Sequence, residues 1–435
     1  MRKVRVGIAG LGTVAQGVLT LLGRNHQLIL ERTGLSIDVV RVASRRAKEV
    51  DLLGADFSTQ LSDLVTDERV DIVLELIGGE QEAHQLIQDA LAAGKRVVTA
   101  NKAVIAAHGN TLLAGDQGSR LAFEAAVAGA IPIVDALQRS LVANRFRQLL
   151  GIINGTCNYM LTTMELEGIS FDEVLARAQS LGYAEADPSF DIEGIDAAHK
   201  LTILLALAFG ARFEFDKIFV EGIAHITADD IRYAAELGYR IKHLGIARQR
   251  QSGLEARVHC ALVANDSLLS HVDGVANAVA LSADAAGDML LSGPGAGAEA
   301  TASAAVADII ALAGSTDTRE TSPQGAEAIQ RDQDNSTSGE TQLLAMDDIE
   351  SAYYLRIPTL DRPGVFAKVA AILSDSNISI EAVIQKEVKA GKEEVFIVIL
   401  TDTVAEKMMS ATCNALGELE DVVGSIVSIR VAPTD

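Results

Sequence analysis

A short apolar segment at the start of the chain runs directly into a glycine-rich turn. Residues 4–9 have the pattern of a buried β-strand, and the turn that contains Gly10 and Gly12 leads into the apolar spacing of a helix. Glycine permits a tight turn and a close approach of the backbone to a pyrophosphate, which the helix N-terminus favours. This unit predicts a dinucleotide-binding domain, with a plain tight turn as the alternative. We expect contacts to the cofactor from Gly10, Gly12, Thr13 and Val14.

Strand and helix patterns then alternate along the chain. Strands are expected at 37–43, 71–77 and 96–99, and a helix at 80–93 with Gly94 as its stop. Repeated strand–helix units pack as a parallel sheet with helices on both faces. We therefore expect an α/β fold whose N-terminal domain contains a Rossmann-type, doubly wound parallel sheet.

The residues after the second strand bear on the choice of cofactor. The strand ends at Ala43, and Arg45 and Arg46 follow where an NAD-selective site usually carries an acidic side chain for the ribose hydroxyls. An arginine can instead pair with a 2′-phosphate. The sequence thus favours NADP(H) over NAD(H), and surface arginines without a ligand are the alternative.

Lys102 follows the strand expected at 96–99. Ligands bind at the carboxyl ends of the strands in doubly wound sheets. We expect Lys102 to reach the nicotinamide or the substrate, whereas a solvated loop lysine is the alternative.

Glu124 lies at the end of another expected strand, 121–124, and precedes a run of small residues. One carboxylate with several exposed backbone carbonyls suits a weakly held monovalent cation better than a catalytic divalent ion. A structural turn is the alternative.

An acidic loop, residues 182–194, precedes the most apolar helix pattern of the chain at 195–209. Asp196 and Lys200 are four residues apart and therefore share one face of that helix. Because the downstream turns are almost entirely apolar, Lys200 is expected at a buried edge, where an ammonium group is kept with partners or for chemistry. The alternative is an acidic cluster at the helix dipole with a surface ion pair.

Charge and cysteine content exclude several partners and settings. The chain has 37 Lys and Arg against 59 Asp and Glu, and its net charge of −22 disfavours nucleic acid and anionic membranes as partners. We find no pattern of a signal peptide or membrane span. The three distant cysteines, Cys157, Cys260 and Cys413, indicate reduced thiols in a cytoplasmic protein.

Changes of pattern divide the chain into domains. The nucleotide-binding domain is expected at 1–135, completed by a small-residue helix near 297–314. Residues 136–314 are expected to form an α+β catalytic and dimerisation domain, in which 228–244 is one helix.

Polar residues without periodicity predict a linker at 315–348. Residues 349–435 have the order βαββαβ, with an Asp-Arg-Pro-Gly turn at 361–364 before the first helix. This module resembles an ACT domain, which implies a small amino acid held at that turn. Threonine is the expected effector, and a dimerisation module without ligand is the alternative.

Five motifs together resemble homoserine dehydrogenases and follow the order found in that family. The resemblance implies reversible, NAD(P)H-dependent reduction of L-aspartate 4-semialdehyde to L-homoserine, in threonine, methionine and isoleucine biosynthesis, by a homodimer or homotetramer. The motifs are Gly-Leu-Gly-Thr-Val at 10–14, Thr-Ala-Asn-Lys at 99–102, Asn-Gly-Thr-Cys-Asn-Tyr at 154–159, the segment 182–200, and Gly-Pro-Gly-Ala-Gly at 293–297.

The resemblance also implies roles for single residues. Lys200 resembles the proton donor to the aldehyde oxygen, and Lys102 and Asp191 resemble supporting groups at the reacting centre. Glu185 and Asp196 resemble substrate ligands. A desolvated lysine suits the first role because the alkoxide left by hydride transfer needs a proton. The implied cofactor contacts are Ala43, Arg45, Arg46, Lys102, Gly182, Glu185 and Gly297.

The family's sodium site corresponds to Glu124 with the carbonyls of Val127, Gly129 and Ile131. The sequence departs from the family where Ala128 and Ala130 replace glycines and Ala300 replaces a common proline.

Two other functional classes are the alternatives to a homoserine dehydrogenase. An acylating semialdehyde dehydrogenase would use Cys157 as nucleophile, but no histidine lies nearby in the sequence to act as its base. A non-catalytic amino-acid sensor would not need the intact glycine turn or the acidic loop with Lys200.

Overall fold

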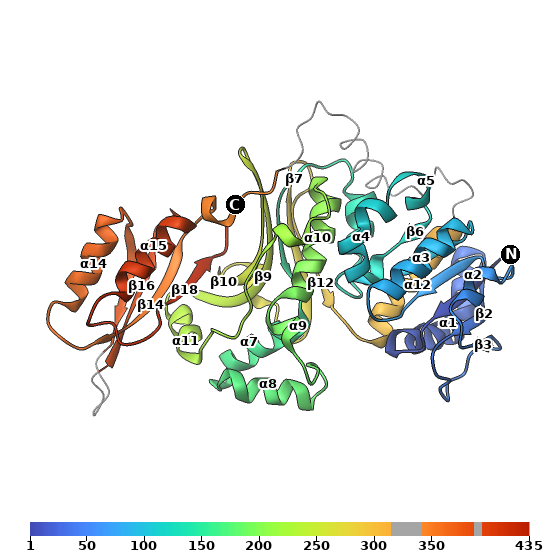
Figure 1. Ribbon diagram of the computed structural model, residues 1–435, viewed down its shortest axis with the longest axis horizontal. Coiled ribbons are helices and arrows are strands. Elements are labelled where there is room, and N and C mark those ends of the chain that lie inside the picture. The colour runs from blue at the N-terminus through green and yellow to red at the C-terminus, as the bar shows by residue number, and fades with distance from the viewer. Residues whose placement is uncertain (315–341, 387–393, 435) are drawn as a thin grey trace.

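The computed structural model describes residues 1–314, 342–386 and 394–434. Three lobes follow one another along the long axis of the molecule, from the N-terminal lobe through a central lobe to a C-terminal lobe (Figure 1). Most of the expected linker, residues 315–341, lies outside the described residues. No helix in the described part of the chain is long and apolar enough to cross a membrane.

Six parallel strands form the sheet of the N-terminal lobe in the order β3-β2-β1-β4-β5-β6. The chain direction across the sheet reverses between β1 and β4, which is where ligands bind in doubly wound sheets. The predicted fold class is confirmed. The strands are β1 (Arg2–Ala9), β2 (Leu35–Ala43), β3 (Asp56–Ser58), β4 (Ile72–Glu75), β5 (Arg96–Thr99) and β6 (Leu121–Ala122).

Helices cover both faces of this sheet. On one face, α1 (Thr13–Thr33) and α12 (Ala298–Gly314) share a core with the inward side chains of β1. These two helices approach so closely that a Cβ atom on Gly17 would lie 2.3 Å from the carbonyl oxygen of Ala298. The other face and the edges carry α2 (Ser62–Thr66), α3 (Gln81–Ala92), α4 (Lys102–Leu112), α5 (Gly115–Gly118) and α6 (Ile133–Asp135).

The central lobe is a mixed sheet with helices packed on it. Its strands run in the order β12-β11-β7-β9-β10, with β8 beside β10. The strands are β7 (Phe146–Ile152), β8 (Phe219–Val220), β9 (Tyr239–Arg250), β10 (Gly253–Ala264), β11 (Ala276–Ala283) and β12 (Gly287–Pro294). The helices are α7 (Gly155–Glu167), α8 (Phe171–Ser180), α9 (Ser189–Ile192), α10 (Ile195–Phe209) and α11 (Ala228–Glu236).

The single helix predicted at 228–244 is wrong. Helix α11 ends at Glu236, and the chain turns at Gly238, which has φ 88°. Residues from Tyr239 onward pair antiparallel with β10 along its whole length. The alternation of the following residues therefore belongs to a strand, and tertiary pairing decides the boundary.

The C-terminal lobe has the predicted βαββαβ order. Its strands align as β18-β14-β16-β15, and β18 also pairs in parallel with β10 of the central lobe. One ten-stranded sheet therefore runs through both lobes. The elements are β13 (Glu350–Ser351), β14 (Tyr353–Leu360), α14 (Val365–Asp375), β15 (Ile380–Gln385), β16 (Glu394–Thr401), β17 (Val404–Ala405), α15 (Glu406–Gly417) and β18 (Val427–Val431).

Candidate active site

Helix α10 begins at the junction of the central and N-terminal lobes. Its N-cap Gly194 has φ 88°, a left-handed conformation that favours glycine and lets the chain turn from the acidic loop into the helix. The first two turns carry Asp196 and Lys200, and the later turns are buried in the core. The sequence therefore places a polar start on an otherwise apolar helix.

Asp196 lies between two ammonium groups. Its Oδ2 is 2.8 Å from Nζ of Lys200, and its Oδ1 is 2.8 Å from Nζ of Lys102. The side chain of Asp196 is 5% exposed and that of Lys200 is 11% exposed. The predicted pair is thus buried, which excludes the surface ion pair considered as its alternative. Lys200 also donates to the carbonyl oxygen of Ile153 at 2.7 Å.

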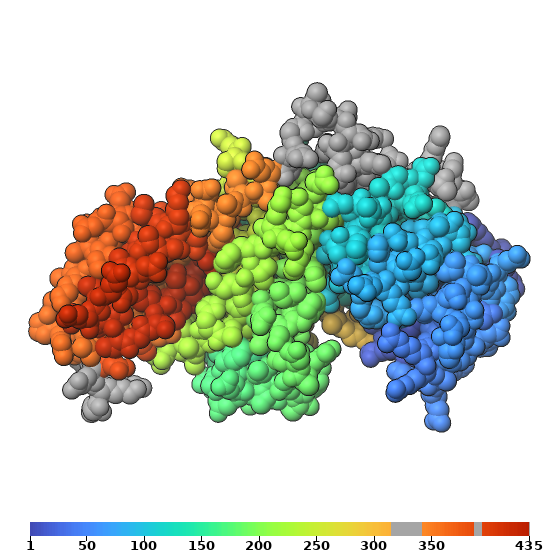
Figure 2. Space-filling model, in the orientation of Figure 1, coloured from blue at the N-terminus to red at the C-terminus, as the bar shows by residue number. Residues whose placement is uncertain are grey.

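The contact between Lys102 and Asp196 joins two lobes. Lys102 begins α4 in the N-terminal lobe, directly beyond β5, whereas Asp196 belongs to the central lobe. A notch separates these lobes below the contact region in Figure 2. A substrate bound here has groups from both lobes within reach.

The pKa values of the two aspartates in this cluster shift in opposite directions. Burial acts to raise the pKa of Asp196, but Lys200 and Lys102 outweigh it and hold that pKa well below its usual range. Burial raises the pKa of Asp191, and the charge of Asp196 adds to this although a hydrogen bond from Asn154 opposes it. Asp196 is therefore the firmly ionised member.

Asn154 was not identified as a site residue from the sequence. It is the N-cap of α7, and its amide contacts both Asp191 and Asp196. The only signal in the sequence was its place at the start of the 154–159 motif.

The structure does not bring Glu185 into this cluster. Glu185 and Gly182 are exposed in the loop between α8 and α9, and Gly182 has φ 75°. Within the described chain, the Glu185 carboxylate pairs with neither Lys102 nor Lys200.

An exposed aromatic side chain adjoins the cluster. The Nζ atom of Lys102 lies 5.4 Å from the ring centroid of Phe190, which is exposed. The ring of His199 stands 5.6 Å from Phe190 and 4.4 Å from Phe215. These aromatic contacts were not predicted, because they join residues that only the fold brings together.

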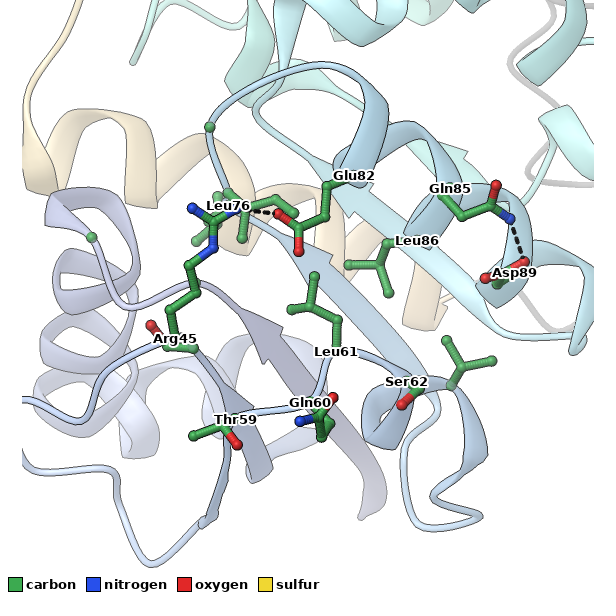
Figure 3. A pocket seen from close by; sticks show the side chains of 16 residues that line it. Arg45, Thr59, Gln60, Leu61, Ser62, Leu76, Glu82, Gln85, Leu86 and Asp89 are labelled. Carbon is green, nitrogen blue, oxygen red and sulfur yellow. Dashed lines mark hydrogen bonds and ion pairs between the residues drawn. The ribbon is translucent and has the colours of Figure 1, made fainter.

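The glycine turn borders a cavity of about 830 Å³ (Figure 3). The N–H of Gly10 donates to the carbonyl oxygen of Ala43 at 2.8 Å, and a Cβ atom on Gly10 would lie 2.7 Å from the carbonyl oxygen of Leu76. A Cβ atom on Gly12 would meet nothing within 4 Å, so the space in front of the first turn of α1 is open. These features fit the predicted pyrophosphate site. Thr13 is exposed and Val14 is half-buried in that turn.

Arg45 lines this cavity and is already paired. Its Nη2 atom is 2.6 Å from Oε2 of Glu82, and the Arg45 side chain is 86% exposed. Figure 3 shows the pair across the cavity, with Leu61 and Leu86 beyond it. Arg46 is exposed but does not line the cavity. Glu82 was not identified from the sequence, because it lies on α3 and far from Arg45 along the chain.

The second glycine turn lies close to the nucleotide-binding helix. Gly297 has φ 120° and directly precedes α12, whose first residue packs against Gly17 of α1. The structure thus brings Gly297 next to the N-terminal lobe, although it is far from that lobe in sequence.

Glu124 is buried and receives hydrogen bonds from the start of α6. Val134 N–H donates to its Oε1 at 2.9 Å, and Asp135 N–H donates to its Oε2 at 2.7 Å. The backbone N–H of Glu124 donates to Oδ2 of Asp308 at 2.9 Å. Burial raises the pKa of Glu124 to about 7 and that of Asp308 well above its usual range. Two buried carboxyl groups at this point are a setting that a cation would stabilise.

The backbone after Glu124 turns sharply. Ala128 has φ 56° and Gly129 has φ 60°, the left-handed region that favours glycine. An alanine at the first position keeps the turn at a cost of about 1 kcal/mol. In the described chain, no backbone N–H donates to the carbonyl oxygens of Val127 and Gly129. The carbonyl oxygen of Ile131 accepts the N–H of Ile133 at 2.8 Å, so of the three predicted carbonyl ligands those of Val127 and Gly129 are without a backbone donor in the described residues.

Cys157 cannot serve as an exposed nucleophile. It is fully buried in α7, and its Sγ donates to the carbonyl oxygen of Asp191 at 3.2 Å. Burial raises the pKa of this thiol well above its usual value, which disfavours the thiolate.

The turn at 361–364 is exposed and leads into α14 through Gly364, which has φ 90°. Behind it, Lys368 pairs with Asp421 at 2.6 Å. Asn377 has φ 55° just before β15.

Three family models match the chain in succession. The first, homoserine dehydrogenase, NAD binding domain, matches residues 10–124, and the second, homoserine dehydrogenase, matches residues 132–310. An ACT domain matches residues 353–417. The homoserine dehydrogenase of Pseudomonas aeruginosa is 46% identical over 434 residues and spans 99% of both chains. The chain belongs to the homoserine dehydrogenase family.

Other homoserine dehydrogenases extend the comparison. That of Bacillus subtilis is 36% identical over 432 residues, which are 97% of this chain and 96% of that one. The crystal structure of a homoserine dehydrogenase from Thiobacillus denitrificans has a TM-score of 0.90 at 46% identity and covers 99% of each chain. A hyperthermophilic archaeal homoserine dehydrogenase in complex with NADPH has a TM-score of 0.60 at 27% identity, over 72% of this chain and 98% of that one.

Membership of the homoserine dehydrogenase family confirms three predictions. The chain is an oxidoreductase that acts on a CH–OH group, it has an NAD(P)-binding domain, and it carries a C-terminal ACT domain. The acylating enzyme and the non-catalytic sensor are excluded as interpretations.

Proposed function

We propose that this chain catalyses the reversible, NAD(P)H-dependent reduction of L-aspartate 4-semialdehyde to L-homoserine in threonine, methionine and isoleucine biosynthesis. The observation that carries the proposal is Asp196, buried between Lys200 and Lys102 where two lobes meet. This arrangement supplies a fixed cationic proton donor next to the carboxyl end of β5. We propose that the chain has a nucleotide-binding domain at 1–135, a catalytic domain at 136–314 and an ACT domain at 349–435.

Lys200 is the proposed general acid. When bound, the nicotinamide supplies a hydride to the aldehyde carbon. The alkoxide oxygen then needs a proton, and Lys200 donates it from Nζ; in the reverse direction the neutral amine accepts the hydroxyl proton. Hydrogen bonds to Ile153 and Asp196 fix the position of that nitrogen. The charge of Lys102 further stabilises the developing negative charge.

Acidic side chains are proposed to bind the amino end of the substrate. Glu185 and Asp196 are the proposed substrate ligands, with Glu185 at the α-ammonium group. Asp191 is the proposed supporting group at the reacting centre. Because Glu185 is exposed in its loop, this role requires the loop to approach the cluster when substrate binds.

The cofactor is proposed to lie from the glycine turn toward Lys102. Gly10, Gly12, Thr13 and Val14 would hold the pyrophosphate, and Ala43 the adjoining ribose. NADP(H) is proposed as the preferred form, supported by Arg45 at the cavity and by the archaeal family member found with NADPH. The remaining proposed contacts are Arg46, Gly182, Glu185 and Gly297.

A sodium ion is proposed at the carbonyls of Val127, Gly129 and Ile131, with the charge of Glu124. Its role is structural, since it would offset buried negative charge at the turn between the lobes.

Regulation and assembly form the last part of the proposal. Threonine is proposed to bind at the turn 361–364 and to lower activity. The chain is proposed to act as a homodimer or homotetramer. A cytoplasmic location is also proposed, in agreement with the free thiols of its three cysteines.

The test is NADPH oxidation with L-aspartate 4-semialdehyde, without phosphate or arsenate. Lys200→Ala is expected to lower kcat by about two to four orders of magnitude with NADPH binding unchanged, because both the proton donor and its charge are lost. Lys217→Ala, which removes an exposed lysine paired with Glu214, should leave kcat unchanged. A Lys200→Ala enzyme within about fivefold of wild type would remove Lys200 from the mechanism. Glu185→Gln is expected mainly to raise KM for homoserine.

A further inference from the structure

One side-chain amide connects the two aspartates of the candidate active site. Asn154 is 4% exposed and follows β7 at the start of α7. Its Nδ2 donates to Oδ1 of Asp191 at 2.8 Å and to Oδ2 of Asp196 at 2.9 Å. Its Oδ1 accepts the backbone N–H of Cys157 at 2.8 Å. Both hydrogens of the amide are thus used on carboxylates, while the oxygen caps the helix.

The amide sets how Asp196 meets the two lysines. Oδ2 of Asp196 receives Nδ2 of Asn154 and Nζ of Lys200, whereas Oδ1 receives Nζ of Lys102. Each oxygen therefore has its own partners, and the plane of the carboxylate is determined on both sides. The direction of the Lys200 Nζ atom depends on the plane of the Asp196 carboxylate. A rotation of that carboxylate would therefore turn Lys200 away from its present position.

The amide also keeps two like charges together. Asp191 and Asp196 share one donor group, and Asn154 supplies the hydrogen bond that the described residues give to the Asp191 carboxylate. Carboxylates that share a site repel each other, and a hydrogen-bond donor between them offsets part of that repulsion. Nδ2 of Asn154 occupies that position.

We propose that Asn154 is a positioning residue for the reaction, which holds Asp191 and Asp196 together and directs Lys200 toward the reacting oxygen. The inference rests on the roles proposed above for Lys200 and Asp191. Asn154 itself touches neither substrate nor cofactor in this scheme and acts through the aspartates.

Two variants separate positioning from helix capping. Asn154→Ser keeps an oxygen for the N–H of Cys157 and removes the amide donors. Asn154→Asp keeps the shape of the side chain and the N-cap hydrogen bond to Cys157, but it turns a carboxylate oxygen toward Asp191 and Asp196. Aspartate and asparagine are about equal as N-caps. A capping role therefore predicts that Asn154→Asp resembles wild type, and the positioning role predicts that it is the worse variant.

The measurement is kcat/KM for homoserine oxidation as a function of pH. We expect kcat to fall on the order of 10–100-fold in Asn154→Ser and further in Asn154→Asp, the scale of a displaced catalytic group. The acidic limb of the profile should move to higher pH in both variants, because the Asn154 amide no longer lowers the pKa of Asp191, and further in Asn154→Asp, where a carboxylate is added beside the two aspartates. KM for the nicotinamide cofactor should be unchanged.

Asn158→Ser is the matched control. Asn158 is equally buried on α7, but its Nδ2 donates to the carbonyl oxygens of Val272, Gly274 and Ala276 and to no carboxylate. Loss of the Asn158 amide should lower the thermal midpoint without moving the pH profile of kcat/KM. Lys200→Ala is measured alongside and tests the proposed mechanism separately. If this variant stays active, the general-acid role of Lys200 is refuted, and that result is distinct from a refutation of the positioning role of Asn154. If Lys200→Ala is inactive while both Asn154 variants keep the wild-type profile and kcat within threefold, the positioning role is refuted.

Discussion

Single charged residues of this chain act differently according to their burial. Asp196 is enclosed, so its two lysines fix its ionisation, whereas Arg45 is largely in water and its bond to Glu82 is open to exchange. Exposed pairs contribute little to stability but can compete with a ligand for the same side chain. The Arg45–Glu82 pair is such a pair, and it lines the proposed cofactor cavity.

Arg45→Ala is expected to raise KM for NADPH by about tenfold and to leave KM for NADH nearly unchanged, because only NADPH carries a 2′-phosphate. Glu82→Gln should act in the opposite direction and lower KM for NADPH by about two- to threefold, since it frees the guanidinium. Initial rates with both cofactors provide the measurement. Glu167→Gln, which breaks another exposed pair that lies on different helices from the cavity, with Arg177, is the control. Equal changes for both cofactors would assign Arg45 to general surface charge.

Glu124 predicts an unusual pH dependence of stability. Its pKa is raised by burial from 4.5 to about 7, so the folded chain binds this proton more tightly than the unfolded chain does. The resulting stability is fully present below about pH 4.5 and is lost as pH rises through about 7. Glu124→Gln cannot titrate and lacks this contribution. The thermal midpoint of wild type relative to Glu124→Gln should therefore fall as pH rises from about 4.5 to about 7.

Sodium should reverse part of this loss. At pH 8, sodium chloride is expected to raise the wild-type midpoint more than choline chloride at equal concentration, and Glu124→Gln should not distinguish the two salts. A difference between wild type and variant that is constant with pH would show that Glu124 keeps an ordinary pKa.

At the scale of elements, the C-terminal lobe is attached through a strand pair and buried charges. Strand β18 pairs with β10, and Arg356 of β14 pairs with Asp230 of α11 at 2.6 Å. Asp230 is fully buried and also caps its own helix through Thr227. A buried pair whose partner is removed leaves an uncompensated charge, which is far more costly than the loss of an exposed pair.

Arg356→Met is expected to lower the free energy of unfolding by about 3–5 kcal/mol, because Asp230 then stays buried without its counter-ion. Arg232→Met removes an exposed arginine paired with Asp229 on the same helix and should cost less than about 1 kcal/mol. Urea unfolding followed by circular dichroism compares the two. Equal losses would mean that the Arg356 pair adds nothing beyond a surface contact.

At the scale of the whole molecule, a series of contacts connects the ACT domain to the candidate active site. Arg430 of β18 pairs with Glu406 at 2.7 Å and reaches Glu221 of the central lobe at 3.4 Å. Directly after Glu221, the N–H of Ile223 donates to the carbonyl oxygen of Ile192 at 2.9 Å, next to the start of α10. Contacts are therefore continuous from β18 to the acidic loop.

Glu221→Gln is expected to weaken the proposed inhibition by threonine without preventing its binding, because one of the ion pairs that join the two lobes is lost. Calorimetry gives the Kd for threonine, and initial rates at millimolar threonine give the inhibition. Coupling of this kind is typically about 1–3 kcal/mol, so inhibition should weaken by up to roughly a hundredfold in threonine concentration. Unchanged inhibition would place the coupling elsewhere, and absence of threonine binding to the full chain would refute the proposed effector.

Features that depend on neighbours along the chain could be predicted from the sequence alone. The strand, glycine turn and helix at the N-terminus, the i,i+4 pair of Asp196 and Lys200, and the βαββαβ order all follow from local spacing, and motifs in one order were enough to indicate the family. Only the tertiary structure decided the boundary at Gly238, because pairing with β10 outweighs local helical preference. It also decided which polar groups meet: Asn154 contacts Asp191 and Asp196 from a separate helix, and Glu82 reaches Arg45 from another element. Such contacts depend on how elements pack, and spacing along the chain carries no record of that geometry.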